Sequence, residues 1–174
     1  AYIDFGGETA LPLINKYDNL VVVRTFSKSR SMAGLRIGYA ISNSELIKAL
    51  NDVKYSYNSY TMNRPSLVLG VESIRDEAYF REKVGQIIAT RERFVKEIAE
   101  LGFTCLPSSA NFVFATHESI PAKEIFAAAK ENNIYVRYFD KPRIDNYLRI
   151  SIGTDAEMDA FVAFLKGYIE TKQN

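Results

Sequence analysis

Residues 25–39 read TFSKSRSMAGLRIGY and carry the most specific motif of the sequence. The apolar run at residues 20–25 predicts a strand that leads into Lys28, and residues 34–41 predict a second strand after a loop of small residues. The pattern places a lysine and an arginine at the mouth of a sheet. Four hydroxyl side chains accompany them along the loop: Thr25, Ser27, Ser29 and Ser31.

The residue types of this loop suit an aldehyde and a phosphate. A lysine amine reacts with an aldehyde only in its neutral form, which burial or positive neighbours favour. Arg30 and Arg36 can supply positive charge. Arg36 with the hydroxyls can also hold a phosphate dianion, because a guanidinium makes paired, charge-assisted hydrogen bonds. Taken alone, Lys28 would be a solvated lysine in an ordinary surface loop. The whole segment of residues 25–39 instead favours a reactive lysine beside an anion site.

Length and composition indicate a globular protein of one domain, or a large domain fragment with a small domain. The 174 residues are 47% hydrophobic and 25% charged, and the net charge of +1 gives no argument for a nucleic-acid or membrane partner. The single Cys105 excludes an internal disulfide, and the single His117 cannot build a multi-histidine metal site, so no metal is expected. No signal peptide or membrane-spanning run is evident, which fits a cytoplasmic enzyme.

The first five residues, AYIDF, form a strand-like run without an initiator Met. Because termini usually lie at a surface, we expect a chain cut in the middle of a strand that ends at Tyr2. A short helix is expected at residues 10–16. The unbroken run LVVV at residues 20–23 is typical of a strand buried on both faces of a parallel sheet.

The rest of the chain alternates between helical and strand patterns. The order of elements after Asp76 indicates a compact α+β unit, so we divide the chain into residues 1–75 and 76–174. Helices are expected at residues 44–54 (capped by Asn43 or Ser44), 65–74, 76–101, 121–131 and 155–169, and strands at 103–106, 111–116, 134–138 and 147–152.

Two arginines lie inside strand-forming runs, Arg137 in VRYF and Arg149 in YLRISIGT. A lone charge in such a run is costly unless it is paired or presented to an anion. On neighbouring strands the two arginines could make one anion clamp. Structural salt bridges to Asp140, Asp145 or Asp155 are the alternative for either residue alone.

The loop motif, TFSK followed by AGLRIGY, resembles the Schiff-base loop of fold-type I enzymes that use pyridoxal 5′-phosphate (PLP). The word LRISIGT resembles the segment that carries the small-domain arginine of the aminotransferases in this group. The word YVRYF followed by DKPRIDNYLR is similar to their histidinol-phosphate branch. The resemblance covers essentially all of the chain and implies an α/β fold. Residues 1–75 would be the last part of the large PLP-binding domain, with a mostly parallel sheet and helices, and residues 76–174 the small C-terminal α+β domain.

The same resemblance implies roles for individual residues. Lys28 would be catalytic, holding the cofactor and then moving a proton as general acid and base. Tyr2 would hydrogen-bond the cofactor's ring oxygen, although its residue type alone favours simple packing at a strand end. Arg137 would help to hold the substrate phosphate, and Arg149 would meet the substrate's anionic end. The cofactor shell in this chain would consist of Tyr2, Thr25, Ser27, Lys28 and Arg36.

For the whole protein the resemblance implies transamination between histidinol phosphate (imidazole acetol phosphate in reverse) and the glutamate/2-oxoglutarate pair, in a homodimer that acts on small molecules. Three alternatives stay open: a PLP-dependent decarboxylase of an amino-acid phosphate, an aromatic amino-acid aminotransferase, and a non-catalytic α/β interaction domain. This chain alone is expected to bind PLP weakly or not at all and to be inactive. The resemblance puts the aspartate that meets the ring nitrogen three residues before Tyr2, ahead of Ala1.

Overall fold

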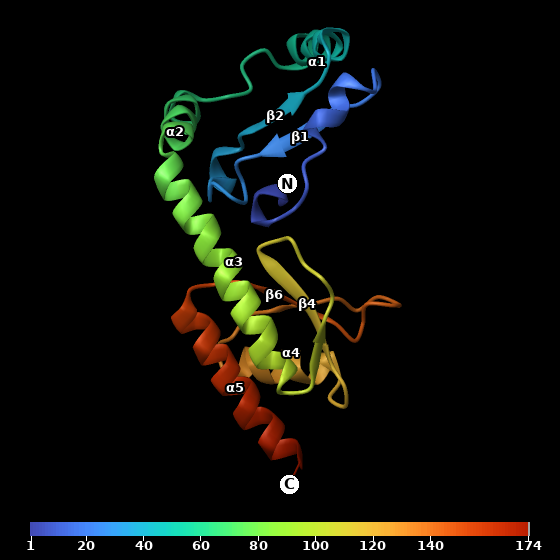
Figure 1. Cartoon of the computed structure of the whole chain (residues 1–174), viewed down its shortest axis with the longest axis vertical. Helices are drawn as coiled ribbons and strands as arrows, with labels where there is room; N and C mark the ends of the chain where they lie inside the picture. Colours follow the sequence, from blue (N-terminus) through green and yellow to red (C-terminus); the bar gives the residue numbers. More distant parts are fainter. Residues whose placement is uncertain (174) are drawn as a thin grey trace. The chain divides into compact units, whose positions relative to one another are not determined.

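The computed structural model describes residues 1–173 and forms two compact units, one comprising Ala1–Val84 and the other starting at Gly85 (Figure 1). Helix α3 (Glu77–Ala99) begins in the first unit and ends in the second. Among the helices of residues 1–173, none combines the length and apolar character that a membrane span requires.

The first unit is built around two short strands, β1 (Val22–Thr25) and β2 (Gly38–Ile41), followed by the helices α1 (Ser44–Tyr57) and α2 (Arg64–Arg75). Asparagines begin both helices. The side-chain oxygen of Asn43 accepts the N–H of Leu46 at 2.9 Å, and that of Asn63 accepts the N–H of Ser66 at 2.9 Å. These bonds satisfy amides that a helix start leaves without a partner. The expected helices and the cap at Asn43 are therefore confirmed.

The expectation of a strand in the first residues, AYIDF, is wrong. Ile3–Phe5 forms a 3-10 turn instead, in which the N–H of Phe5 bonds to the carbonyl of Tyr2 at 3.0 Å. Gly6 closes the turn with a φ of 106°, a conformation that glycine adopts without strain. The backbone N–H groups of Phe5 and Gly7 bond to carbonyls within the segment, and the Phe5 side chain is completely buried. The expected short helix at residues 10–16 is a 3-10 helix, Leu11–Asn15.

The strands of the first unit are antiparallel, whereas a mostly parallel sheet was expected. Val22 lies opposite Ile41, and Thr25 lies opposite Gly38. A parallel pair requires a crossover connection, usually a helix, but the chain between β1 and β2 contains only the 3-10 turn Ala33–Leu35. The second strand also starts later than expected, because Arg36 adopts a left-handed φ of 57° and breaks the extended run. Burial differs as well, since Val23 is 67% exposed.

The second unit is an antiparallel sheet with helices on one face. Its strands follow the order β3 (Phe103–Cys105), β4 (Phe112–His117), β6 (Leu148–Ser151) and β5 (Arg137–Tyr138). The helices are α3, α4 (Ala122–Glu131) and α5 (Asp155–Gln173), and Figure 1 shows α3 and α5 running alongside each other. The helices and the sheet enclose a core whose largest fully buried side chains are Phe94, Ile98, Val113, Ile125, Leu148 and Leu165.

Alternation along the strands gives this sheet two different faces. Val113, Ala115, Leu148 and Ile150 point into the core and are buried. Their neighbours in sequence occupy the other face. There the strand register aligns Phe114 with Arg149 and Arg149 with Arg137, so one row across three strands holds a ring and two guanidiniums.

An ion-pair network joins α3 to α5. The guanidinium of Arg93 pairs with Asp159 at 2.6 Å and with Asp155 at 3.0 Å, and the hydroxyl of Thr90 donates to Asp155 at 2.8 Å. The Thr90 hydroxyl and then the Arg93 guanidinium lower the pKa of Asp155. Gly102, with a φ of 83°, follows the end of α3, a position at which a left-handed glycine commonly terminates a helix.

Candidate functional site

Lys28 lies in the tight loop that follows β1. Its carbonyl accepts the N–H of Ser31 at 3.0 Å, and the carbonyl of Phe26 accepts the N–H of Met32 at 3.0 Å. The half-buried Lys28 places its Nζ 5.4 Å from the centroid of the Tyr2 ring. The 3-10 turn at the start of the chain therefore brings Tyr2 to the lysine, although 26 positions separate them in sequence.

Two hydroxyls at the end of β1 form a pair beside this loop. Oγ1 of Thr25 lies 2.9 Å from Oγ of Ser27 and also accepts the Ser27 N–H at 3.1 Å. Oγ1 of Thr25 also lies 3.3 Å from the carbonyl oxygen of Ile37, so its one proton has two possible acceptors, Ser27 and Ile37. The sequence-predicted residues Tyr2, Thr25, Ser27 and Lys28 are thus all part of one local structure.

Asp4 was missed by the sequence analysis. Its Oδ1 accepts from Nη2 of Arg24 at 2.5 Å, and its Oδ2 accepts from the hydroxyl of Ser29 at 2.5 Å. Ser29 is buried, and its hydroxyl is committed to Asp4 rather than open to a phosphate. No short-range sequence signal reveals this anchor, because its partners lie 20 and 25 residues away.

The two arginines of the loop differ in their surroundings. Nη1 of Arg36 donates to the carbonyl of Ala33 at 2.9 Å, and its remaining N–H groups have no partner among the residues that the structure describes. Arg30 instead lies 4.2 Å from the centroid of the Phe80 ring, pairs with Glu77 at 3.7 Å and donates to the carbonyl of Ser73. Arg36 is therefore the arginine with N–H groups available to a ligand, while Arg30 already has protein partners.

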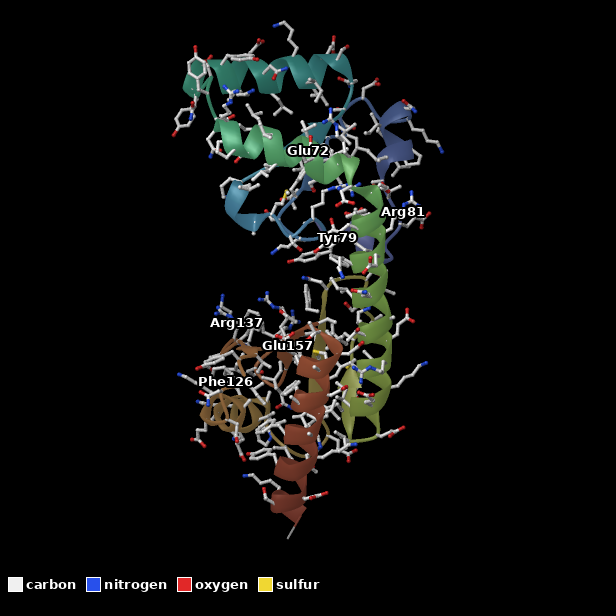
Figure 2. The ribbon with its side chains drawn as sticks, turned by 90° about the vertical axis from the view of Figure 1, so that its left-hand side faces the viewer. Glu72, Tyr79, Arg81, Phe126, Arg137 and Glu157 are labelled. Carbon is white, nitrogen blue, oxygen red and sulfur yellow. The ribbon has the colours of Figure 1, made fainter. Side chains whose placement is uncertain are left out.

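Arg30 also lines a cavity of about 260 Å³ in the first unit. Glu72 and Tyr79, both labelled in Figure 2, lie at the same cavity.

Arg137 and Arg149 lie directly opposite each other in the β5–β6 register. Neither forms an ion pair with an acidic side chain within residues 1–173, so the alternative of structural salt bridges is not observed. Of the three aspartates considered, Asp155 pairs with Arg93 instead. Arg137 belongs to β5, an edge strand of the sheet, and Figure 2 labels it together with Phe126 of α4.

Aromatic rings surround the two guanidiniums. Cζ of Arg149 lies 5.4 Å from the centroid of Phe112 and 5.9 Å from that of Phe139, and Cζ of Arg137 lies 5.4 Å from that of Phe139. A cavity of about 510 Å³ opens here, and Arg149, Phe112, Phe114, Phe139 and Ile144 contribute to its wall. The rings were missed by the sequence analysis, although the alternation of residues 112–115 places both phenylalanines on one face.

Residues 1–165 match the family model described as aminotransferase class I and II. The chain belongs to this family. It is 51% identical over 173 residues to the histidinol-phosphate aminotransferase of Lactococcus lactis subsp. lactis (strain IL1403), covering 99% of this chain and 48% of that protein. The aminotransferase chain therefore spans about half the length of the curated relatives it matches.

Solved structures agree with this aminotransferase assignment. The histidinol-phosphate aminotransferase of Clostridium acetobutylicum superposes with a TM-score of 0.88 at 26% identity, covering 98% of this chain and 53% of that one. The enzyme of Sinorhizobium meliloti, solved in complex with pyridoxal 5′-phosphate, gives 0.83 at 28% identity, covering 98% and 47%. The fold class, an α/β fragment of the PLP-transferase fold, is confirmed, and the family supports PLP as the cofactor.

The aminotransferase chain offers groups that fit PLP. Lys28 carries an amine that would suit the aldehyde, and the Ser27 hydroxyl and the N–H groups of Arg36 are groups that would suit the phosphate. Within the described residues no cluster of histidine, cysteine or carboxylate side chains could hold a metal ion.

Proposed function

We propose that the whole protein is a PLP-dependent aminotransferase that interconverts histidinol phosphate and imidazole acetol phosphate with the glutamate/2-oxoglutarate pair. The single observation that carries the proposal is the half-buried Lys28 over the Tyr2 ring, at the end of β1. The family match and the 51% identity to a histidinol-phosphate aminotransferase support the same activity.

Lys28 is proposed as the catalytic residue. Its Nζ would hold the aldehyde carbon of the cofactor until the substrate amine displaces it. The released Lys28 amine would then carry a proton between the substrate carbon and the cofactor as general base and acid. PLP, when bound, supplies the electron sink for this proton transfer. No ion pair with a carboxylate occupies the Lys28 amine within residues 1–173, so the amine is available for this work.

The cofactor is proposed to be held by the residues around Lys28. Ser27 donates its hydroxyl proton and Arg36 its N–H groups to the phosphate, while Thr25 orients Ser27 through the 2.9 Å contact. Tyr2 positions its ring against the Lys28 side chain. A phosphate that accepts these bonds is fixed in place, which aligns the aldehyde with the lysine.

The substrate is proposed to meet Arg137 and Arg149. Two guanidiniums on opposite positions of β5 and β6, with no acidic partner among the described residues, suit a dianion such as a phosphate monoester. The aromatic wall of the adjacent cavity suits a flat ring such as imidazole. We further propose a cytoplasmic homodimer without nucleic-acid or membrane partners.

The test is product analysis with the whole protein, PLP and histidinol phosphate. Transamination predicts glutamate formation from 2-oxoglutarate in equal amount to the substrate consumed. Release of carbon dioxide from an amino-acid phosphate, with no glutamate formed, would show a decarboxylase instead. Faster turnover of phenylalanine or tyrosine than of histidinol phosphate would show an aromatic aminotransferase. A near-ultraviolet and visible absorbance scan with added PLP excludes the interaction-domain alternative if a new band appears.

A further inference from the structure

Phe139 touches both arginines of the second unit. It follows Arg137 by two residues, and its ring centroid lies 5.4 Å from Cζ of Arg137 and 5.9 Å from Cζ of Arg149. The ring is itself held at an edge-to-face angle of 68° by Phe114, which stacks on Tyr147 with 4.7 Å between centroids. The Phe139 ring, which packs against Phe114, therefore lies within cation–π distance of both guanidiniums.

The Phe139 ring reduces the electrostatic repulsion between the guanidiniums of Arg137 and Arg149. Like charges directly opposite each other on adjacent strands repel and destabilise the pair. The face of an aromatic ring carries negative charge density and attracts a guanidinium within about 6 Å. A ring within that range of both arginines offsets part of their repulsion before any anion arrives. It also limits the directions in which two long side chains can point.

We propose that Phe139 is a positioning residue that holds Arg137 and Arg149 together as one clamp for the substrate's phosphate. This inference rests on the proposed function of the two arginines. It adds a residue whose side chain carries no charge and whose role is to keep the clamp assembled. Since a preassembled clamp loses less side-chain freedom on binding, the effect falls on substrate affinity rather than on the chemical step.

The experiment compares Phe139→Leu, Phe139→Tyr and Phe126→Leu in the whole enzyme with PLP bound. Phe126 is the matched control, because its ring stacks on Tyr138 from α4 and touches neither arginine. For each variant, kcat and KM for histidinol phosphate, the inhibition constant of inorganic phosphate and the midpoint of thermal unfolding are measured.

Phe139→Leu is expected to raise KM and the phosphate inhibition constant by about five- to tenfold, the scale of one to two cation–π contacts, with kcat within about twofold. Phe139→Tyr keeps the ring and is expected to stay close to the parent enzyme in both constants. Phe126→Leu is expected to lower the unfolding midpoint while leaving both constants unchanged. An unchanged KM in Phe139→Leu, or an equal rise in Phe126→Leu, overturns the inference.

Arg149→Lys separates this inference from the proposed function. If Arg149→Lys raises KM and Phe139→Leu does not, the clamp stands and the role of Phe139 is wrong. If neither variant changes KM or phosphate inhibition, the substrate site itself is wrong. In the double variant Phe139→Leu/Arg149→Lys, the loss is expected to be smaller than the product of the single losses, because both changes disrupt one contact. Fully multiplicative losses contradict the shared contact.

Discussion

Asp4 accepts a hydrogen bond from Ser29, with 2.5 Å between Oδ2 and Oγ, and its other oxygen pairs with Arg24 at 2.5 Å. One carboxylate therefore ties the start of the chain both to β1 and to the residue next to Lys28. Both side chains of the ion pair are largely buried, at 19% and 23% exposure, so solvent screens it less than a surface pair. We expect the position of the loop that carries Lys28 to depend on this anchor.

Replacing Asp4 with Asn is expected to weaken PLP binding about tenfold, because a charge-assisted hydrogen bond contributes on the order of 1.5–3 kcal/mol. The amide keeps the size of the side chain but loses the charge that pairs with Arg24. Equilibrium titration of the whole protein with PLP measures the effect. Asp18→Asn is the control, since the Asp18 side chain is exposed and distant in sequence from the loop contacts. Equal affinities for both variants would contradict the anchor.

Lys28→Ala is expected to reduce turnover by at least about a thousandfold, within the range seen for loss of a general acid–base group. Folding should be preserved, because the side chain is only half-buried and makes one ring contact. Steady-state assays and circular dichroism measure the two effects, with the exposed Lys16→Ala as control. Near-normal turnover in Lys28→Ala would remove Lys28 from its proposed role.

Arg149→Lys and Arg36→Lys are expected to affect different ligands. A lysine keeps the charge but cannot replace the paired donors of a guanidinium. Arg149→Lys should therefore raise KM for histidinol phosphate about tenfold with little change in PLP affinity, and Arg36→Lys should do the reverse. Separate titrations with PLP and substrate measure this. Identical losses for both ligands in both variants would be incompatible with two separate anion sites.

Asp155→Asn is expected to lower the thermal stability of the protein at neutral pH but not in strong acid. The Thr90 hydroxyl and Arg93 lower the pKa of Asp155 from its ordinary value of 3.8, so its contribution is fully present above 3.8 and is lost as the pH falls through the lowered value. Unfolding midpoints of parent and variant should differ at pH 7 and converge in acid. Glu92→Gln serves as control, because it is an exposed change on α3, the helix that carries Thr90 and Arg93. A difference that persists or grows in acid would contradict this assignment.

The thiol of Cys105 is expected to resist alkylation in the folded protein. Burial raises its pKa to about 11, so only about a thousandth is thiolate at pH 8. Mass spectrometry after iodoacetamide treatment should show slow labelling in the native protein and rapid labelling in urea. Equal rates in both conditions would show that the thiol is not protected.

Local signals in the sequence were sufficient for most helices. Asn43 and Asn63 each precede an apolar period of three to four residues, and a cap and a period are properties of consecutive residues. The TFSK word likewise made Lys28 a candidate without knowledge of its surroundings. The left-handed Arg36 was not predicted, because its conformation arises within a loop that gives no regular pattern.

Features that depend on contacts between residues far apart in the sequence could not be predicted from local patterns. The bond from Asp4 to Ser29 joins residues 25 positions apart, and the 3-10 turn at Ile3–Phe5 replaces a strand that its composition favours. The adjacency of Arg137 and Arg149 was anticipated only as neighbouring strands. Their position opposite each other depends on a register that hydrogen bonds between β5 and β6 determine.

That register couples the proposed clamp to the interior of its unit. Arg149 stands between Leu148 and Ile150, which are 1% and 2% exposed. A slip of one residue would exchange the two faces of the strand, driving the guanidinium among apolar side chains and lifting both aliphatic residues into water. Burial of Leu148 and Ile150 therefore selects the register in which Arg149 faces the ligand site. In a variant that only loosens the packing of β6, phosphate affinity should fall before the midpoint of thermal unfolding does.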